Sequence, residues 1–519
     1  MSWRINDPQC HEADKIKYLV VPYTRGRGLD IGCGPNKAFP HFIGVDNFSD
    51  TRQFGIGMKP DVFVQDATRL DLFTSHSMDF VFSSHALEHI EDTEKALKEW
   101  WRVLKTGGYM VLYLPHKDFY PNIGEPGANP DHKHDFLPDD IINVMRGIKG
   151  FDLLINEDRD HDNGEGQPGN EYSFLQVYRK RNDDEIRFPC KSEKPKKTAF
   201  VVRYGGFGDM IQASSILPGL KEQGFHVIFN TTEKGKNVLE HDPHIDEFYL
   251  QDTDQVPNNE LGMYWSALKK RHTKFINLSE SVEGALLSLP GRVDSFWPDE
   301  ARRLIKNINY IELTHAIAEV RLPPRSKFYA SDAEKKWAHK ESQKMTGLKI
   351  LYSLSGSSVH KAWPHIDALF ARLLLTYPDS TIILVGDQMC KLLEQGWENE
   401  MRVWRRSGEW TIRQTLTFAC HAADLVIGPE TGVLNAAGME NVPKIVTLSH
   451  SSEENLTKHW KNTISLKPKN VHCYPCHRMH YNFDNCIRHD SGTALCQWNT
   501  TIDQMWEAVQ THLKKSEAA

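Results

Sequence analysis

Three acidic residues near the N-terminus each lie in a short apolar run. Asp30 lies in "GLDIGCG", where Gly32 and Gly34 let the backbone turn tightly and leave room for a ligand. Asp46 ends the next run, "HFIGVD", and an acid at the end of a second strand can accept hydrogen bonds from ribose hydroxyls. Asp66 ends "VFVQD", where a helix cap is the alternative interpretation. The ordered set predicts a pocket for a nucleoside.

Two later segments concentrate histidines. In "SSHALEHIED", His85 and His89 have the i, i+4 spacing of a metal-binding pair on a predicted helix. In "GANPDHKHDF", His132 and His134 are candidates for a general base, because the pKa of histidine lies near the operating pH. A polar surface loop or adventitious metal binding is the alternative for this second segment.

A second glycine-rich turn, "RYGGFGDMIQ", carries Asp209 close to the start of a predicted helix. Asp209 is either a charge that stabilises the helix N-terminus or a general base exposed at the strand ends. Two segments further along bear on this choice: "LYSLSGSSVHKAWP" contains Lys361, and "VIGPETGVLNAAG" places small residues at a helix start. Free backbone N–H groups there could hold a diphosphate, and Lys361 would neutralise its charge.

Four cysteines gather near the C-terminus, in "CYPCHRMHYNFDNCIRHDSGTALC". They are Cys473, Cys476, Cys486 and Cys496. A Cys-x-x-Cys pair with two further cysteines suggests structural zinc, although the spacing is not that of a ribbon or a finger. A disulfide or redox pair, and thiols buried in a loop, are the alternatives.

Several α/β domains must position these residues. The chain has 519 residues, of which 39% are hydrophobic and 25% charged, a composition typical of a globular protein with more than one domain. Short apolar runs alternate with helical patterns, which predicts doubly wound parallel sheets. We expect a first domain at 1–181, a polar linker at 182–197, and two more α/β domains at 198–345 and 346–519.

Net charge and hydropathy limit the binding partners and the cellular location that we expect. The net charge of -7 disfavours duplex nucleic acid, which usually requires a basic surface. No apolar run approaches the roughly 20 residues that span a bilayer, and the polar N-terminus has no signal-peptide core. We therefore expect a cytoplasmic protein, with a peripheral membrane contact left open.

The first group of motifs resembles the class I S-adenosyl-L-methionine (SAM)-dependent methyltransferases, over roughly residues 15–181. The resemblance implies that the glycine motif, with Asp30, carries the methionine part of the cofactor. It further implies that Asp46 binds the ribose and that Asp66 lies beside the adenine.

The same resemblance bears on the first histidine segment, which is the usual one after the fourth strand in that family. We therefore expect Glu88 and His89 to support the wall of the active site, and no metal to be bound.

The second group of motifs resembles the heptosyltransferase-type glycosyltransferases of family nine, over about residues 198–512. The resemblance implies a GT-B arrangement, with two Rossmann-like domains facing a cleft: an acceptor domain at 198–345 and a nucleotide-sugar domain at 346–519. It makes Asp209 the base. The residues it assigns to the nucleotide-sugar are Ser355, Ser357, Lys361, Glu430, Thr431 and Gly432, and Lys361 also has a catalytic role. The family usually has Asp at the position of Glu430, so the donor sugar could differ.

Together these resemblances imply a bifunctional enzyme that acts on a saccharide. One half would transfer a methyl group from SAM, to a sugar hydroxyl, and the other would transfer a sugar from a nucleotide-sugar such as ADP-heptose with inversion. Synthesis of lipopolysaccharide or another surface glycan is the expected setting, and no metal is expected to be required. The alternatives are an enzyme that modifies nucleic acid bases and a pair of domains that only bind.

Overall fold

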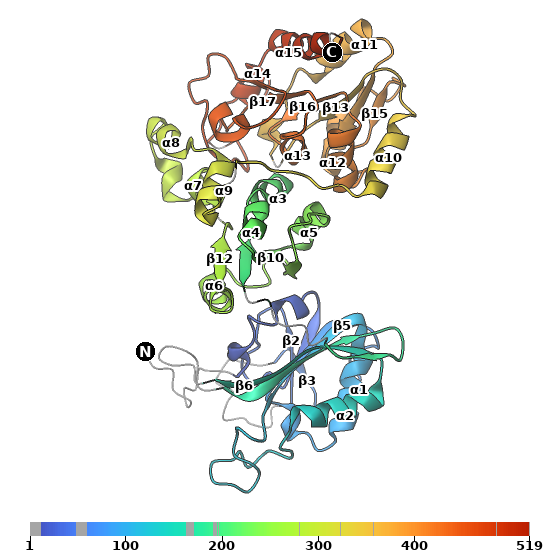
Figure 1. Ribbon diagram of the computed structural model, residues 1–519, viewed down its shortest axis with the longest axis vertical. Coiled ribbons are helices and arrows are strands. Elements are labelled where there is room, and N and C mark those ends of the chain that lie inside the picture. The colour runs from blue at the N-terminus through green and yellow to red at the C-terminus, as the bar shows by residue number, and fades with distance from the viewer. Residues whose placement is uncertain are drawn as a thin grey trace. The chain divides into compact units, whose positions relative to one another are not determined.

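The computed structural model describes residues 12–47, 60–161, 171–189, 195, 197–279, 281–321, 323–356, 358–483 and 485–517. The chain forms two compact units (Figure 1). The first comprises residues 1–196 and 250–271, and the second comprises residues 197–249 and 272–519. The chain therefore passes between the units three times. Among the described residues, every helix is too short or too polar to cross a membrane.

One mixed sheet organises the first unit, with the strand order β3-β2-β1-β4-β5-β7-β6-β8. Its strands are β1 (Gly28–Ile31), β2 (Ile43–Asp46), β3 (Val62–Phe63), β4 (Met78–Ser84), β5 (Leu104–Pro115), β6 (Phe151–His161), β7 (Glu171–Lys180) and β8 (Ile186–Arg187). Strands β1 to β5 are parallel, whereas β7 runs antiparallel between β5 and β6. The parallel part brings the ends of β1, β2 and β4 to one edge, where the predicted pocket residues follow.

Helical segments connect and cover these strands. They are the 3-10 turns η1 (Glu12–Lys15), η2 (Val21–Tyr23) and η3 (Leu87–His89) and the helices α1 (Thr93–Val103) and α2 (Pro138–Ile148). The unit also contains helix α6 (Leu261–Lys269), which belongs to its second segment, residues 250–271. Helix α1 begins where the Asp92 side chain accepts a hydrogen bond from the Lys95 N–H at 2.9 Å. Its apolar face, with Leu97 and Trp100 fully buried, packs into the core of the sheet.

Apolar runs in this region predict six strands, which are β1 to β5 and β7, and the additions are β6 and β8. The sequence of β6, "FDLLINEDRDH", is apolar only in its first half, and the strand lies near the edge of the sheet between β7 and the two-residue β8. Strand β8 lies inside the segment that the sequence suggested as a linker.

The second unit contains two parallel sheets. The four-stranded sheet has the order β11-β10-β9-β12, and the six-stranded sheet has the order β15-β14-β13-β16-β17-β18. Their strands are β9 (Thr198–Val202), β10 (His226–Thr231), β11 (Glu247–Leu250), β12 (Lys274–Asn277), β13 (Lys349–Ser353), β14 (Thr381–Val385), β15 (Val403–Arg405), β16 (Leu425–Pro429), β17 (Lys444–Thr447) and β18 (Thr463–Leu466). The predicted α/β class with parallel sheets is confirmed.

Helices alternate with these strands. In the first half they are α3 (Phe207–Ser214), α4 (Leu217–Glu222), α5 (Glu233–Leu239), α7 (Ser281–Ala285), η4 (Val293–Phe296), α8 (Asp299–Lys306), α9 (Tyr310–Ala318) and α10 (Asp332–Ser342). In the second half they are η5 (Val359–Lys361), α11 (Ile366–Thr376), η6 (Gln388–Glu394), α12 (Ile412–His421), α13 (Gly432–Ala437), the π-helical η7 (Glu453–Thr457), α14 (Leu495–Trp498) and α15 (Ile502–Glu517).

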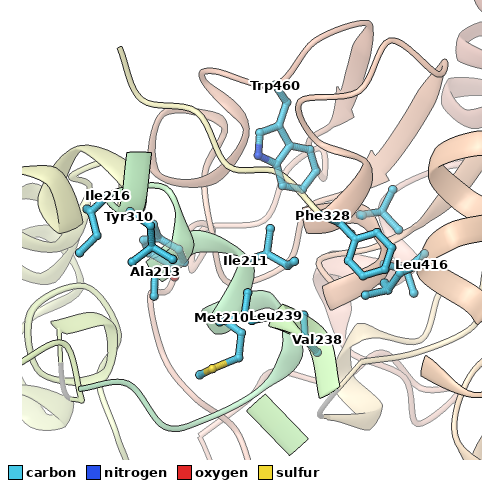
Figure 2. Close-up of a cluster of buried hydrophobic side chains, with 14 of the residues drawn as sticks. Met210, Ile211, Ala213, Ile216, Val238, Leu239, Tyr310, Phe328, Leu416 and Trp460 are labelled. Atoms are coloured by element: carbon cyan, nitrogen blue, oxygen red, sulfur yellow. The ribbon is translucent and has the colours of Figure 1, made fainter. Parts of the chain in front are cut away.

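A single hydrophobic core joins the two halves of the second unit. Figure 2 shows Met210 and Ile211 of α3 in the same buried cluster as Leu416 of α12, Phe328 and Trp460. Because this core is continuous, the two sheets are held together by burial of apolar surface as well as by the chain itself.

We expect Ile211→Ala to lower the free energy of unfolding by about 2–5 kcal/mol, because it leaves a cavity in this shared core. Urea denaturation followed by tryptophan fluorescence would measure the loss. Leu375→Ala is the matched control, since Leu375 is 84% exposed on α11. Equal, small losses for both variants would contradict a shared core.

Candidate functional site

The first glycine turn follows β1 and has no room for side chains. Gly32 has φ +74°, and a Cβ atom placed on it would lie 2.2 Å from the Cβ of Ala86. Gly34 also has positive φ, at +57°, and its N–H donates to the Asp46 carboxylate at 2.9 Å. The structure therefore brings together Gly32, Gly34 and Asp46, as the nucleoside-pocket prediction requires.

Asp30 lies beneath this turn and is only 3% exposed. Its carboxylate accepts a hydrogen bond from the Ala38 N–H at 2.8 Å, and burial raises its pKa to about 7. This contact fixes the loop that follows β1. Contact with the methionine part of SAM stays a prediction for Asp30.

Asp66 is exposed and makes a local turn. Its carboxylate accepts a hydrogen bond from the Thr68 N–H at 2.8 Å, and hydrogen bonding to Thr68 lowers its pKa. The contact closes a local turn, and no helix begins at this point of the described chain, so the helix-cap interpretation of Asp66 is wrong. The adenine contact stays a prediction.

The histidine segment after β4 is not the α-helix that the i, i+4 spacing assumed. His85 has φ +50° and lies outside any helix, and a 3-10 turn covers only Leu87–His89. The loop that contains His132 is attached here, because the N–H groups of Lys133 and His134 donate to the Glu88 carbonyl at 2.8 and 3.3 Å. The two histidine segments, 46 or so residues apart in the chain, thus form one cluster.

The two predicted base candidates have different surroundings. His132 is buried, its Nε2 lies 3.9 Å from Glu88 Oε1, and burial lowers its pKa to about 4. His134 instead places Nε2 3.1 Å from the carbonyl oxygens of both Ile90 and Glu91. His132 is therefore neutral at pH 7 and faces a carboxyl group, whereas His134 is held by backbone. Neither arrangement tests the proposed proton transfer.

In the second unit, Asp209 lies in the first turn of α3. One carboxylate oxygen accepts from the Gly206 N–H at 2.7 Å, and the other pairs with Arg203 at 2.9 Å. Arg203 is 1% exposed and also pairs with Glu283 at 2.9 Å. Burial opposes the charge on Arg203, but the two carboxylates raise its pKa. These contacts fit the helix-start interpretation of Asp209, and its role as a base stays a prediction.

Lys361 joins the two predicted phosphate segments. Its ammonium group donates to the Glu430 carbonyl at 3.0 Å, and burial lowers its pKa. A Cβ atom on Gly356 would lie 3.1 Å from the Lys361 side chain and 3.3 Å from that of Thr431. Ser355 donates to the Ser358 carbonyl at 3.2 Å, and Ser357 lies outside the described residues.

The acid–threonine–glycine turn is fixed by buried polar contacts. Glu430 is 5% exposed and accepts from the N–H groups of Ser449 and Ser451, while His450 pairs with it at 2.6 Å. Burial raises the pKa of Glu430, but these partners, His450 above all, lower it to about 2. Thr431 caps α13 by accepting from the Leu434 N–H at 3.5 Å. Glu430 is therefore an ionised, structural anchor for this turn.

The helix starts of α3 and α13 contact each other. A Cβ atom on Gly432 would lie 2.9 Å from the Cβ of Phe207 and 3.2 Å from the Gly208 nitrogen. One turn deeper, Gln212 donates to the Asn435 side chain at 3.0 Å. The structure thus brings Asp209 and the Glu430–Gly432 turn, more than 200 residues apart in the chain, into one region.

Sequence reasoning missed the partners of these residues. Arg203, Glu283 and His450 were not singled out, although Arg203 directly follows strand β9, just before the glycine turn. This position in the sequence was the feature from which a role for Arg203 could have been predicted. Glu283 and His450 have no comparable sequence signal, because only the fold brings them to their partners.

The four C-terminal cysteines line one cavity beside this region. The cavity is also lined by Lys361, His360, His450 and His480. All four thiols are free, so the structure does not contain the disulfide alternative. Burial raises the pKa of Cys476 to about 12 and that of Cys486 to about 11.

Comparisons with known proteins agree with the motifs in the first unit. Residues 29–112 match the methyltransferase domain family. The N-terminal part of the chain therefore contains a methyltransferase domain. A 129-residue segment is 31% identical to an uncharacterised protein of Methanocaldococcus jannaschii, over 24% of this chain and 61% of that protein. The chain thus spans less than two thirds of that relative.

Solved structures of a heptosyltransferase and of a SAM-dependent methyltransferase are each similar to part of the chain. Escherichia coli ADP-heptose lipopolysaccharide heptosyltransferase II is 14% identical with a TM-score of 0.43, over 62% of this chain and 99% of that one. A SAM-dependent methyltransferase from Archaeoglobus fulgidus is 19% identical with a TM-score of 0.25, over 32% of this chain and 94% of that one.

We expect Asp46→Ala to weaken SAM binding about 10- to 100-fold, because it removes a charged hydrogen-bond acceptor worth about 1.5–3 kcal/mol. Isothermal titration calorimetry would measure the change. Asp71→Ala is the control, since Asp71 forms an exposed ion pair with Arg69. Unchanged affinity in the Asp46 variant would remove this residue from the pocket.

Proposed function

We propose that the chain is a bifunctional transferase that builds a methylated glycan. Its first unit would methylate a hydroxyl group, on a sugar, with SAM as the methyl donor. Its second unit would transfer a sugar with inversion from a nucleotide-sugar, an ADP-sugar such as ADP-heptose, to a saccharide acceptor. Synthesis of a surface polysaccharide such as lipopolysaccharide, on the cytoplasmic side, is the setting that fits both reactions.

The geometry around Gly32 supports the methyltransferase half of this proposal. The turn after β1 excludes side chains at Gly32, and Asp46 at the end of β2 lies within hydrogen-bond distance of Gly34. Bound SAM would supply an activated methyl group. The residues of the chain have to hold the cofactor and align the acceptor oxygen with it, since alignment accounts for much of the rate of such transfers.

The observation that carries the glycosyltransferase half is the meeting of the Asp209 and Glu430–Gly432 turns. In this proposal the acceptor hydroxyl lies near α3, and Asp209 removes its proton as the oxygen attacks the anomeric carbon. The diphosphate leaves toward Ser355, Thr431 and Gly432. Lys361, whose ammonium group is 3.0 Å from the Glu430 carbonyl, offsets the charge that develops there.

Two activities in one chain would act in sequence on the same glycan. Covalent linkage raises the effective concentration of one product at the next site, without any new contact. A tether of this kind is useful when the intermediate is a dilute or membrane-bound saccharide.

We expect Asp209→Asn to lower sugar transfer at least about 100-fold, because a carboxamide cannot accept the acceptor's proton at neutral pH. Incorporation of labelled sugar from ADP-sugar would measure it, and an unchanged urea denaturation curve of the variant is the control for folding of the second unit.

Glu283→Gln is the matched control for the ion pair itself. It removes the other partner of Arg203 and leaves the Asp209 carboxylate in place. Normal turnover in Asp209→Asn, or an equal loss in both variants, would reduce Asp209 to a helix-start charge.

We also expect SAM and ADP each to raise the melting temperature, because a ligand at 100 times its Kd stabilises the native state by about 2.7 kcal/mol. Differential scanning fluorimetry would measure both shifts, with Asp46→Ala blunting only the first and Lys361→Ala only the second. No shift with ADP, together with a strongly salt-dependent affinity for DNA, would favour a modifier of nucleic acid bases.

A further inference from the structure

The cluster formed by the two histidine segments surrounds one buried carboxyl group. Glu88 is 0% exposed, and among the described residues neither of its carboxyl oxygens has a hydrogen-bond partner. Three imidazole nitrogens surround its Oε1: His85 Nδ1 at 3.8 Å, His89 Nε2 at 3.9 Å and His132 Nε2 at 3.9 Å. These separations are too long for hydrogen bonds. A buried carboxyl group without a partner costs folding free energy, so its presence requires an explanation.

We propose that Glu88, His89 and His132, with His85 beside them, bind a divalent first-row transition metal ion. The side-chain atoms of Glu88, His89 and His132 that could coordinate an ion lie within 4.8 Å of one another. Two imidazoles and a carboxylate are the donor set of catalytic zinc and of non-haem iron sites. This proposal reverses the expectation that the segment only forms a wall of the active site and binds no metal.

Hydrogen bonds to the outer ring nitrogens of His85 and His89 leave the other nitrogen of each ring directed toward Glu88. His89 Nδ1 lies 3.2 Å from the Asp131 carbonyl oxygen, which can only accept, so the proton is on Nδ1 and the lone pair of Nε2 faces Glu88. Likewise, His85 Nε2 lies 2.9 Å from Ser173 Oγ, which leaves Nδ1 toward Glu88. Metal-binding histidines characteristically have their second nitrogen held in this way.

Charge and space also suit a cation. A cation would compensate the charge of the buried Glu88 carboxylate, for which the described part of the chain provides no hydrogen-bond donor. Ligand atoms that lie about 2.1 Å from a tetrahedral ion are about 3.4 Å from one another. The separations of 3.8–3.9 Å between Glu88 Oε1 and the imidazole nitrogens therefore have to shorten by roughly half an ångström on binding.

The position of the cluster gives the ion a possible task. Ala86, between His85 and Glu88, packs against Gly32 of the predicted cofactor turn. An ion bound there would lie near the SAM pocket and could take an acceptor oxygen as a further ligand, which lowers the pKa of that hydroxyl. This role depends on the proposed methyltransferase activity, whereas metal binding itself does not.

The test is metal binding by the full-length protein. After chelation, the protein is titrated with Co²⁺ and followed by visible absorption, and bound metal per chain is measured by mass spectrometry. We expect Glu88→Gln and His132→Ala each to weaken Co²⁺ binding by on the order of 100-fold or more, since even outer partners of metal ligands contribute 10–100-fold. His134→Gln, in the same loop but bonded to backbone, should bind as the parent does.

The cysteine cluster requires its own control. Thiolates give Co²⁺ an intense near-ultraviolet charge-transfer band that imidazole and carboxylate ligands do not, and Cys476→Ser removes one thiol. If Co²⁺ binding is lost in Cys476→Ser but kept in Glu88→Gln and His132→Ala, the proposal is wrong. It is equally wrong if the parent protein binds no Co²⁺. SAM affinity, measured for each variant, verifies that the first unit is folded and keeps this result separate from failure of the proposed methyl transfer.

Discussion

The close approach of the α3 and α13 helix starts is the constraint on which the second unit depends. Gly208 and Gly432 meet with too little room for a side chain, and Gln212 bonds to Asn435 just behind them. The continuous apolar core around Ile211 holds both helices at that separation. A side chain on Gly432 would meet the Cβ of Phe207 and the backbone of Gly208, and it would therefore force the turns that carry Asp209 and Thr431 apart. Packing and the candidate site are therefore two consequences of one contact.

In the first unit, the corresponding constraint is the contact of Gly32 with Ala86. It brings the end of β1 to the start of the segment after β4, where His85 and Glu88 follow. Backbone hydrogen bonds from Lys133 and His134 to Glu88 then attach the later loop. The parallel order of β2, β1 and β4 sets all of these ends along one edge, which is where α/β sheets place their ligands.

Sequence reasoning succeeded where local chemistry and local structure coincide. Runs such as "LKILYS" and "STIILV" are buried on both faces, so they read as central parallel strands and are β13 and β14. It failed at edges and at distant contacts. Strand β6, next to the edge of the sheet, is polar in its second half and was not predicted. The i, i+4 spacing of His85 and His89 suggested a helix that the positive φ of His85 prevents. The pairing of Arg203 with Glu283 depends on the parallel pairing of β9 with β12. Spacing along the chain cannot reveal which side chain the fold places opposite.

Two buried glutamates show how neighbouring groups determine whether a carboxyl group is ionised. Glu430 and Glu88 are both removed from solvent, which by itself favours the neutral acid. Around Glu430, His450 and the N–H groups of Ser449 and Ser451 outweigh burial and lower the pKa to about 2. The Glu88 carboxyl oxygens have no hydrogen-bond partner in the described part of the chain, and burial raises the pKa of Glu88 to about 8. Glu430 is thus part of a complete ion pair, whereas three imidazole nitrogens lie 3.8–3.9 Å from Glu88 Oε1 without bonding to it, and a cation between them would complete that interaction.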